Sequence, residues 1–554
     1  MNQNNLNIDG LIKILKIEKR EVSSIYIYAI FSGLIQLIFP LGIQTILGFV
    51  LGSTMVTTVY ILIFLIIISV LVIGYLQISQ LKIIENLQQK IFVKYALLYA
   101  ETIPEFNIKD TDNYYLPEKI NKFFDVTTIQ KGLSKILIEI PSTIIQITFG
   151  LLLLSFYHPI FVLLSLLLFL IIFLLLKQTS KIGLETSLAE SNSKYSIVGW
   201  LQEIGRVIKT LKHSQNNNLP ILRTDIKLLN YISYRTAHFK VLLFQFKSLI
   251  LFKFFVTGLF ISVGTYLMFN QSINIGQFVA VEIVIITVIN SVEKLILSLE
   301  TFYDVITGIY KVDSVLKLEK EKSGSILLNE GIYKIEFKNV AFSYQNNEQA
   351  ILNNLNFTIP KAGLVCVSGD ENSGKTTLLK LIAGLYLNHQ GTISFNNILL
   401  RNYNHKFLRE KIGVFLYPQE LFNGTLYENI TIGRDITENE IITLIQALEF
   451  SDFLTLFNDS FETKILELGK TLPHSTRVKI LLLRAFINNP SMLVLKDPIT
   501  GFDSKTKKSI FKYLIKQANI KPVIVSSTNK LFLSNCDLHI LLKNSNSTII
   551  KNNE

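Results

Sequence analysis

Three long stretches of the chain carry no charged side chain. Residues 22–81, 140–176 and 254–281 contain no Asp, Glu, Lys or Arg, and the last stretch continues after Glu282 to about residue 292. A membrane-spanning helix needs about 20 apolar residues. Each stretch therefore has room for two spans, joined by a short turn near 52–54, 156–159 or 270–272. The pattern predicts six spans arranged as three helical hairpins.

Charged segments separate these hairpins. Residues 82–139 and 177–253 carry Lys and Arg, whereas the turns inside the hairpins carry neither. Because positively charged loops stay in the cytoplasm, this asymmetry places both segments and the N-terminus there. Both segments are too long to be simple connectors. We expect them to be helical extensions of the spans, with tips at 104–117 and around 215–218.

The two ends of the chain have different patterns. Residues 1–21 mix Leu and Ile with Lys, Glu and Arg, which predicts an amphipathic cytoplasmic lead-in without a cleavable signal peptide. The spans lie within residues 22–310. A charged linker at 311–330 follows them and precedes alternating strands, turns and helices. We expect an all-α six-helix transmembrane domain followed by an α/β domain over residues 331–554.

Composition also indicates a membrane protein. The 554 residues are 49% hydrophobic with a net charge of +12, and the mean hydropathy is +0.40. A basic balance is typical of nucleic-acid binding or of loops that face anionic lipid. In so apolar a chain we favour membrane lipid and expect no nucleic-acid partner. The two cysteines, Cys366 and Cys536, lie in apolar runs and do not indicate a disulfide framework.

The α/β part contains a phosphate-binding motif. Residues 369–376 are GDENSGKT, which fits G-x-x-x-x-G-K-[ST] between an expected strand and an expected helix, a context that argues against a chance match. Backbone N–H groups of such a loop cradle phosphates. Lys375 is expected to pair with the β- and γ-phosphates, and Thr376 to ligate Mg²⁺. The expected ATP-binding residues of this P-loop are Gly369, Asp370, Glu371, Asn372, Ser373, Gly374, Lys375, Thr376 and Thr377.

Further motifs accompany the P-loop. They are VAFSY ending at Tyr344, LFNGT at 421–425, Arg484-Ala485 and Gly501-Phe502-Asp503. With them, nearly the whole chain resembles exporter-type half-transporters of the ABC transporter family, whose cassette is a P-loop NTPase. The resemblance implies that Tyr344 stacks on adenine. It also implies a dimer, with a like or unlike half-transporter, that exports an unidentified substrate across a bacterial cytoplasmic membrane. Because only about twenty residues precede the first span, we expect no peptidase domain of the kind that some peptide exporters carry.

The motor motifs depart from the family pattern. Where the family has Asp-Glu-Pro after an apolar strand, this chain has Lys496-Asp497-Pro498. Lys496 then stands at the Mg²⁺-binding Asp, and Asp497 at the catalytic Glu that activates water. Two unit charges about 4 Å apart interact by about 4 kcal/mol near a protein surface, so repulsion in place of attraction weakens a Mg²⁺ site. Lys496 either replaces part of the Mg²⁺ charge or points to solvent.

Other motor positions are also degenerate. The signature LSGGQ aligns with Leu472 and then with Pro473, His474, Ser475 and Thr476; the switch His aligns with Thr528; the Q-loop Gln aligns with Tyr417, although Gln419 lies two residues on. We therefore expect an ABC-type ATPase that binds ATP and hydrolyses it weakly or only with a partner. The alternative is a non-hydrolysing regulatory or scaffolding subunit paired with an active half-transporter. Glu282, the charge inside a span, either lines a substrate path or reaches water at the outer turn.

Overall fold

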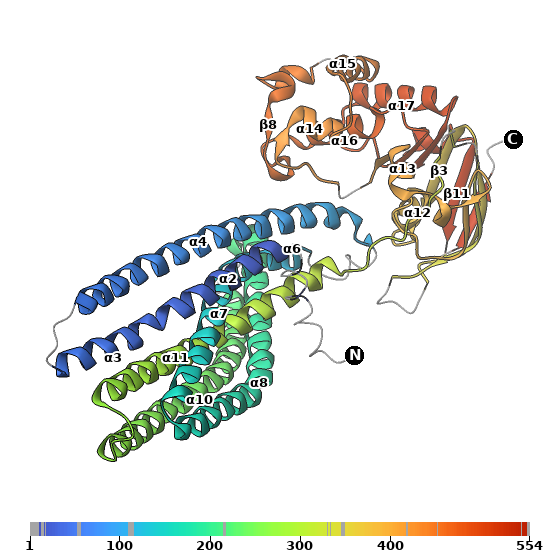
Figure 1. The fold of residues 1–554 in the computed structure, drawn as a ribbon. Coiled ribbons are helices and arrows are strands. Elements are labelled where there is room, and N and C mark those ends of the chain that lie inside the picture. Colours follow the sequence, from blue (N-terminus) through green and yellow to red (C-terminus); the bar gives the residue numbers. More distant parts are fainter. Residues whose placement is uncertain are drawn as a thin grey trace. The chain divides into compact units, whose positions relative to one another are not determined.

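Figure 1 shows the chain as a computed structural model. The structure describes residues 10, 12, 16, 18–52, 57–108, 116–213, 218–328, 331–332, 334–344, 350–416, 419–450, 452–543 and 546–550. The chain divides into two compact units. The membrane unit is formed within residues 1–105 and 115–318, and the cassette unit within residues 106–114 and 319–554.

The described residues of the membrane unit form helices. These are α2 (Lys19–Gln36), α3 (Ile38–Leu51), α4 (Thr57–Thr102), η1 (Ile103–Glu105), α6 (Leu116–Ile120), η2 (Asn121–Phe124), α7 (Asp125–Tyr157), α8 (Pro159–Arg206), α9 (Ile208–Lys212), α10 (Leu219–Phe269) and α11 (Ile275–Leu316). Six segments are long and apolar enough to cross a membrane, with α2 and α3 counted as one. The prediction of six spans is confirmed, and the chain is a multi-pass membrane protein.

The hairpin turns lie where the uncharged runs break. His158 separates α7 from α8, and its Nδ1 accepts a hydrogen bond of 3.2 Å from Ile160 N. Asn274 caps α11 through a reciprocal pair with Gln277. Each of α4, α8 and α10 continues well beyond a single span, as the long charged segments predicted. The first turn and parts of the expected tips at 104–117 and 215–218 lie outside the described residues.

Close packing of α7 on α11 forms the centre of the membrane unit. A Cβ on Gly132 of α7 would collide with Val305 of α11, and one on Gly150 would lie 2.7 Å from Val288 Cγ2. Glycine therefore lets the two backbones approach closely. Phe161 of α8 and Phe260 of α10 stack beside them, with ring centroids 5.7 Å apart.

The cassette unit has two main sheets. The first is antiparallel, in the order β2 (Leu352–Pro360), β1 (Lys334–Phe342), β4 (Gln390–Phe395) and β5 (Ile398–Leu399). The second has the order β12 (Asn546–Ile550), β11 (Leu538–Lys543), β3 (Gly363–Gly369), β10 (Pro522–Ser526), β9 (Met492–Lys496) and β6 (Ile412–Phe415). Its strands are parallel except for β12. Every residue of β10 is buried, as in a sheet covered on both faces.

Helices surround these sheets. They are α12 (Lys375–Ile382), η3 (Leu400–Asn402), α13 (His405–Glu410), α14 (Leu426–Thr431), α15 (Glu438–Ala447), η4 (Leu454–Leu456), η5 (Ser460–Glu462), η6 (Glu467–Gly469), α16 (His474–Phe486), α17 (Ser504–Ala518) and α18 (Lys530–Leu533). A small sheet pairs β7 (Gly424–Thr425) with β8 (Lys464–Ile465). The expected α/β domain after an all-α membrane domain is therefore present.

Two details refine the expected domain limits. Helix α11 continues to Leu316, beyond the expected linker start at residue 311. Part of the expected tip at 104–117 belongs to the cassette unit: Phe106 forms an antiparallel bridge with Lys320, and Asn107 N donates to Glu319 O over 2.9 Å. Most of the expected lead-in lies outside the described residues.

Candidate nucleotide-binding site

The P-loop lies between buried strand β3 and helix α12. The chain turns sharply here, with φ of 148° at Gly369 and 91° at Gly374, values that suit glycine. A Cβ on Gly369 would collide with Leu542 O and lie 2.6 Å from Ser373 Oγ. The spacing of the motif's glycines is thus set by close backbone contacts, and the loop ends at the first residue of α12.

Three groups at this loop suit a phosphate. Lys375 Nζ donates to Gly369 O at 2.8 Å and to Asp370 O at 2.5 Å, so its ammonium lies over the loop backbone. The first backbone N–H groups of α12 have no partner within the helix. Ser373 Oγ is buried and has no hydrogen-bond partner among the described residues. An anion at this loop would satisfy donors that the protein leaves unpaired.

Tyr344 connects the antiparallel sheet with the P-loop helix. It follows β1, and its hydroxyl lies 3.2 Å from Thr377 Oγ1. Its ring meets Phe342 and Tyr386 edge to face, with centroids 5.2 and 5.8 Å apart. The structure therefore brings the predicted adenine residue next to the predicted phosphate loop.

The end of strand β9 lies at the same edge of the sheet. Lys496 pairs in register with Ser526 of β10, which in turn pairs with Val367 of β3. With neighbouring strands about 4.8 Å apart, the Lys496 backbone lies roughly 10 Å from β3. The Lys496 side chain is half-buried. It forms no hydrogen bond or ion pair with another described residue.

Asp497 occupies a strained turn after β9. Its φ is 45°, in the left-handed region that Asp tolerates better than most residues. Its N–H donates to Ser526 O over 2.9 Å, and its carbonyl accepts from Thr500 N over 3.2 Å. These bonds fix the backbone of Asp497 at the sheet edge.

A magnesium ion fits this site less well than a phosphate does. Mg²⁺ prefers oxygen ligands and usually one or two carboxylates. Thr376 offers a hydroxyl, but an ammonium stands at the end of β9. Among the described residues, no group of three or more His, Cys, Asp or Glu side chains could hold a metal ion.

The loop after β6 does not direct Gln419 toward a ligand. The Gln419 amide donates to Val414 O and accepts from Leu416 N, each over 3.3 Å. It therefore caps the end of its own strand. Tyr417, at the position of the family's glutamine, lies outside the described residues.

The segment that the resemblance aligns with the signature motif lies at the start of helix α16. Pro473 precedes the helix and makes no side-chain cap, His474 is exposed, Ser475 is half-buried and Thr476 is buried. A Cβ on Gly501 would lie 3.4 Å from His474 Nδ1. A bulky imidazole therefore occupies the space beside the D-loop glycine.

The D-loop and the switch position follow β9 and β10. Asp503 caps α17 by accepting from Lys505 N at 3.0 Å and Thr506 N at 3.3 Å. Hydrogen bonds from the Thr506 side chain and backbone hold its pKa below the usual value. Thr528, which the resemblance aligns with the family's switch histidine, is exposed just before α18.

Arg484 is a structural residue of the site whose role the motif match did not reveal. Its guanidinium donates to Asn429 O at 2.8 Å and to Glu420 O at 3.2 Å, so α16 is bound to α14 and to the loop after β6. Burial lowers the pKa of Arg484 to about 10. An arginine just after the signature within a helical pattern was the available signal.

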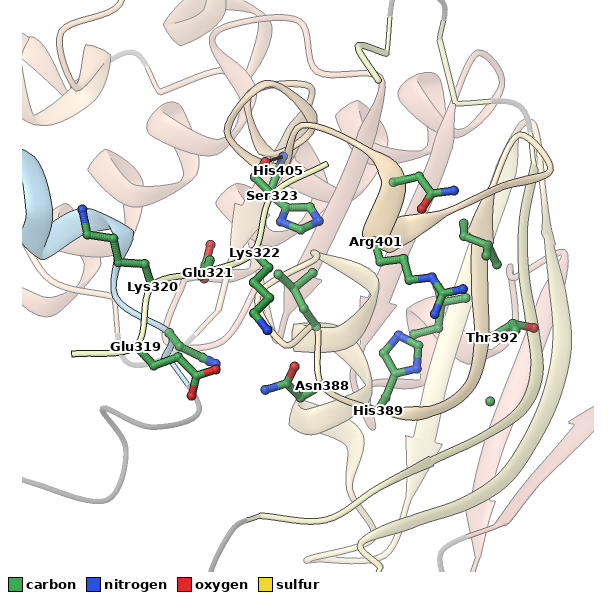
Figure 2. Close-up of a pocket in the computed structure, with 16 residues that line it drawn as sticks. Glu319, Lys320, Glu321, Lys322, Ser323, Asn388, His389, Thr392, Arg401 and His405 are labelled. Atoms are coloured by element: carbon green, nitrogen blue, oxygen red, sulfur yellow. Dashed lines mark hydrogen bonds between the residues drawn. The ribbon is translucent and has the colours of Figure 1, made fainter. Parts of the chain in front are cut away.

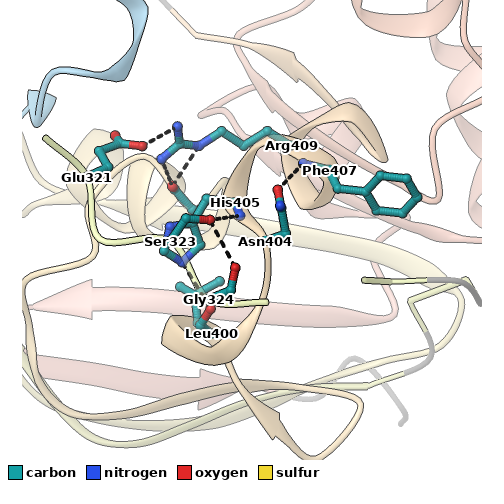
Figure 3. Close-up of polar contacts among 9 residues, drawn as sticks. Glu321, Ser323, Gly324, Leu400, Asn404, His405, Phe407 and Arg409 are labelled. Carbon is teal, nitrogen blue, oxygen red and sulfur yellow. Dashed lines mark hydrogen bonds and ion pairs between the residues drawn. The ribbon is translucent and has the colours of Figure 1, made fainter. Parts of the chain in front are cut away.

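The linker is anchored near the carboxyl end of the P-loop helix. Glu321 forms an ion pair with Arg409, with 2.7 Å between Glu321 Oε2 and Arg409 Nη1. The Arg409 guanidinium also donates to Gly384 O, just after α12, at 2.7 and 3.0 Å. Beside them, Ser323 Oγ accepts from His405 N at 2.9 Å (Figure 3).

A cleft of about 500 Å³ opens beside this anchor. Lys322 and Arg401 extend along it, and His389 lies across from the linker (Figure 2). Burial lowers the pKa of both His389 and His405. The cleft therefore borders the linker, which connects the membrane unit to the cassette unit.

Comparisons with known proteins point to one family. The model of the family "ABC transporter" matches residues 352–500, which include the P-loop and the end of β9. The alpha-hemolysin translocation ATP-binding protein HlyB of Escherichia coli O157:H7 is 29% identical over 283 residues, 51% of this chain and 40% of that protein. The ATP-dependent lipid A-core flippase of Haemophilus influenzae (strain 86-028NP) is 30% identical over 227 residues, 40% of this chain and 39% of that protein. The chain spans half or less of these curated relatives.

The whole fold has a solved counterpart. A bacterial Atm1-family ABC exporter with ATP bound superposes with a TM-score of 0.83, covering 96% of this chain and 94% of that one. The sequence identity is 14%, so this likeness concerns the fold. Both units, the helical and the α/β, share it.

Proposed function

This chain belongs to the ABC transporter family, in the exporter type that fuses a membrane domain to a cassette, and we propose that it is an ATP-binding exporter subunit of a bacterial cytoplasmic membrane. In this proposal the N-terminus and the cassette lie in the cytoplasm, and closure of two cassettes around ATP is coupled to export. The observation that carries it is the P-loop, whose lysine, helix N-terminus and unpaired Ser373 hydroxyl converge on one place.

The proposed subunit hydrolyses ATP slowly. Lys496 repels a metal where the family uses a carboxylate, and Thr528 cannot take the role of a histidine. A barrier raised by about 1.4 kcal/mol slows turnover tenfold. ATP binding, in contrast, rests on groups that the chain retains, and the Lys496 ammonium supplies part of the positive charge that Mg²⁺ would bring.

Each nucleotide site of the proposed dimer combines the P-loop of one chain with the α16 end of another. Either a second copy or a distinct half-transporter satisfies this arrangement. A partner with full motifs would raise the rate of hydrolysis at the nucleotide site that is built on the partner's P-loop. The site on this P-loop would still contain Lys496, so we expect a partner to restore only part of the activity.

The exported molecule is proposed to be amphiphilic. The relatives are named for translocation of a hemolysin and for flipping of lipid A-core. Large molecules with apolar parts match the apolar character of the six spans.

The test uses the full chain in proteoliposomes. We expect an ATP analogue to bind in the presence of EDTA, ATP turnover to be far slower than that of an exporter with intact motifs, and a co-reconstituted partner to raise it in part. Rapid turnover by this chain alone, coupled to transport, would contradict slow hydrolysis. Failure to bind the analogue with or without Mg²⁺ would contradict the proposal as a whole.

A further inference from the structure

The membrane unit contains a cavity of about 450 Å³, which we call the amide cavity. Its volume lies within the range of small-molecule sites, roughly 300–1,000 Å³. It is formed by α2, α3, α4, α7 and α11 together with Leu37. Its lining includes Gln36, Gln77, Gln146 and Thr287, together with Gly74 and Ile283.

None of the residues that line the amide cavity is charged. Its polar members are three glutamines and one threonine, set among aliphatic and aromatic walls. Glu282 is next in sequence to a lining residue but does not line the cavity itself. A charge placed here would lose its hydration without gaining a counter-ion. The cavity therefore disfavours an ionised group.

Hydrogen bonds join some of these amides and hold the cavity's polar wall. Gln146 Nε2 donates to Gln36 Oε1 over 2.7 Å, and Ser291 Oγ donates to Gln146 Oε1 over 2.8 Å. This chain of bonds connects α2, α7 and α11. It fixes the orientation of two glutamines that lie 110 positions apart in the sequence.

Other amide groups remain available to a ligand. Gln77 makes no hydrogen bond with another described residue, and the Gln36 amide nitrogen donates to none of them. An amide nitrogen offers two donors and an amide oxygen accepts two bonds. Gln77 is exposed and Gln36 is half-buried, so an occupant that displaces water from these amides without pairing with them leaves polar groups unsatisfied, at a cost of several kcal/mol. A hydrocarbon tail would leave this cost in place, whereas a ligand with its own amides would remove it.

We propose that the amide cavity binds a neutral, apolar molecule that carries amide groups, such as a segment of apolar peptide without charged side chains. The apolar walls bury the side chains, and Gln36 and Gln77 pair with the backbone amides. This inference rests on the proposed export function and names the chemical class of its substrate.

Glycine 74 offers a direct way to fill the cavity. It lines the space, and a Cβ built on it meets no atom within 4 Å. A larger side chain can therefore be placed at this point of the cavity wall without a collision at its Cβ. Gly258 of α10 also has no atom within 4 Å of its Cβ and does not line the cavity, so it provides a matched control.

The probe is a capped leucine tripeptide, N-acetylated and C-amidated, whose central leucine carries a photoreactive diazirine. The full chain in lipid nanodiscs is labelled with it, and the labelled residues are identified by mass spectrometry. We expect labelling in α4 or α7 along the cavity. Gly74→Phe reduces the space for the probe, and Gln77→Leu removes the amide while keeping a side chain of similar size. Each should raise the probe concentration that gives half-maximal labelling about tenfold or more. Gly258→Phe should leave it unchanged.

Two further probes separate the possible occupants. The same tripeptide with a free carboxylate should label at least about tenfold more weakly, because the cavity has no counter-charge. An alkyl diazirine without amides should not depend on Gln77. Equal labelling by the carboxylate probe, equal loss with the alkyl probe in Gln77→Leu, or no effect of Gly74→Phe would overturn the inference.

Binding of an ATP analogue in the same samples separates this inference from the proposed function. If the variants bind the analogue as the unmodified chain does, their cassettes are folded, and unchanged labelling of Gly258→Phe shows that a phenylalanine in the membrane unit does not by itself abolish uptake of the probe. A chain that binds the analogue but never takes up the capped probe contradicts the amide cavity alone. A chain that takes up the probe but binds no analogue contradicts the proposed function instead.

Discussion

Strands β3 and β9 end at the same edge of one parallel sheet, separated only by β10, yet their ends differ in chemistry. At the end of β3, glycines, Lys375 and a helix N-terminus form a phosphate loop. At the end of β9, an ammonium, that of Lys496, precedes Asp497, whose backbone is in the strained left-handed region. We expect binding to depend on the loop backbone and Lys375 at the end of β3, and hydrolysis to depend on the side chains at the end of β9. The two can therefore be lost separately while the fold persists.

The largest effect in this comparison should come from the β3 side. Lys375→Ala removes the cation that faces the phosphates while leaving the loop's glycines in place. Losing charge-assisted hydrogen bonds should weaken ATP-analogue binding about 100-fold, which corresponds to about 2.7 kcal/mol. Fluorescence titration of the full chain with the analogue measures this change in the dissociation constant. Lys516→Ala, at an exposed lysine of α17, is the control and should bind normally.

A change at the β9 side should affect turnover more than binding. The double variant Lys496→Asp, Asp497→Glu restores a carboxylate for the metal and a longer base. Because the signature and the switch position remain altered, we expect a rise in ATP turnover of only about tenfold, or about 1.4 kcal/mol in the barrier. Binding should also become more dependent on Mg²⁺.

The matched control for this exchange is Lys496→Ala alone. It removes the repulsion without supplying a ligand, so analogue binding in EDTA should weaken while turnover rises little. If Lys496 only faces solvent, the alanine variant will bind the analogue as before. The proposal that this ammonium supplies part of the metal's charge would then be wrong.

A smaller effect tests how the linker is anchored. Arg409→Gln removes the ion pair with Glu321 and the bonds to Gly384 O, so we expect the cassette to lose about 2 kcal/mol of unfolding free energy. Glu321→Gln keeps the bonds to Gly384 and should cost less. Pulse proteolysis of the full chain in urea measures the unfolding free energy of the cassette. Equal losses in both variants would mean that the Gly384 bonds contribute nothing.

Patterns that are local in the sequence predicted most of the fold. Uncharged runs predicted the six spans, and the P-loop motif with its flanking pattern predicted a strand, a turn and a helix. The position of Lys496 at the sheet edge followed from its place after an apolar strand. In each case the physical signal lies within about twenty neighbouring residues.

Features that depend on distant residues could not be predicted in this way. The Gln36–Gln146 pair joins two spans, and nothing near either glutamine indicates the other. Gln419 was a candidate to replace the Q-loop glutamine, but its amide bonds to the backbone of its own strand. Phe106 joins the cassette unit because it pairs with Lys320, a partner more than two hundred positions away. Isolated glutamines inside uncharged runs were the one available hint of the amide cavity.

The smallest expected effect concerns pH, and it tests the same linker anchor from its buried side. His405 is 2% exposed, its Nδ1 has no described partner, and burial lowers its pKa below the unfolded value. Below about pH 6.5 the unfolded chain therefore takes up a proton that the folded cassette refuses, so stability is present above that pH and is lost as the pH falls toward the folded pKa. His405→Phe should be less sensitive to acid than the unmodified chain in pulse proteolysis at pH 7.5 and 5.5. It should not be insensitive, because burial also lowers the pKa of His389 and His539. If His405→Phe lost as much stability as the exposed-site control His474→Phe over this range, protonation of His405 would not be what loosens the anchor.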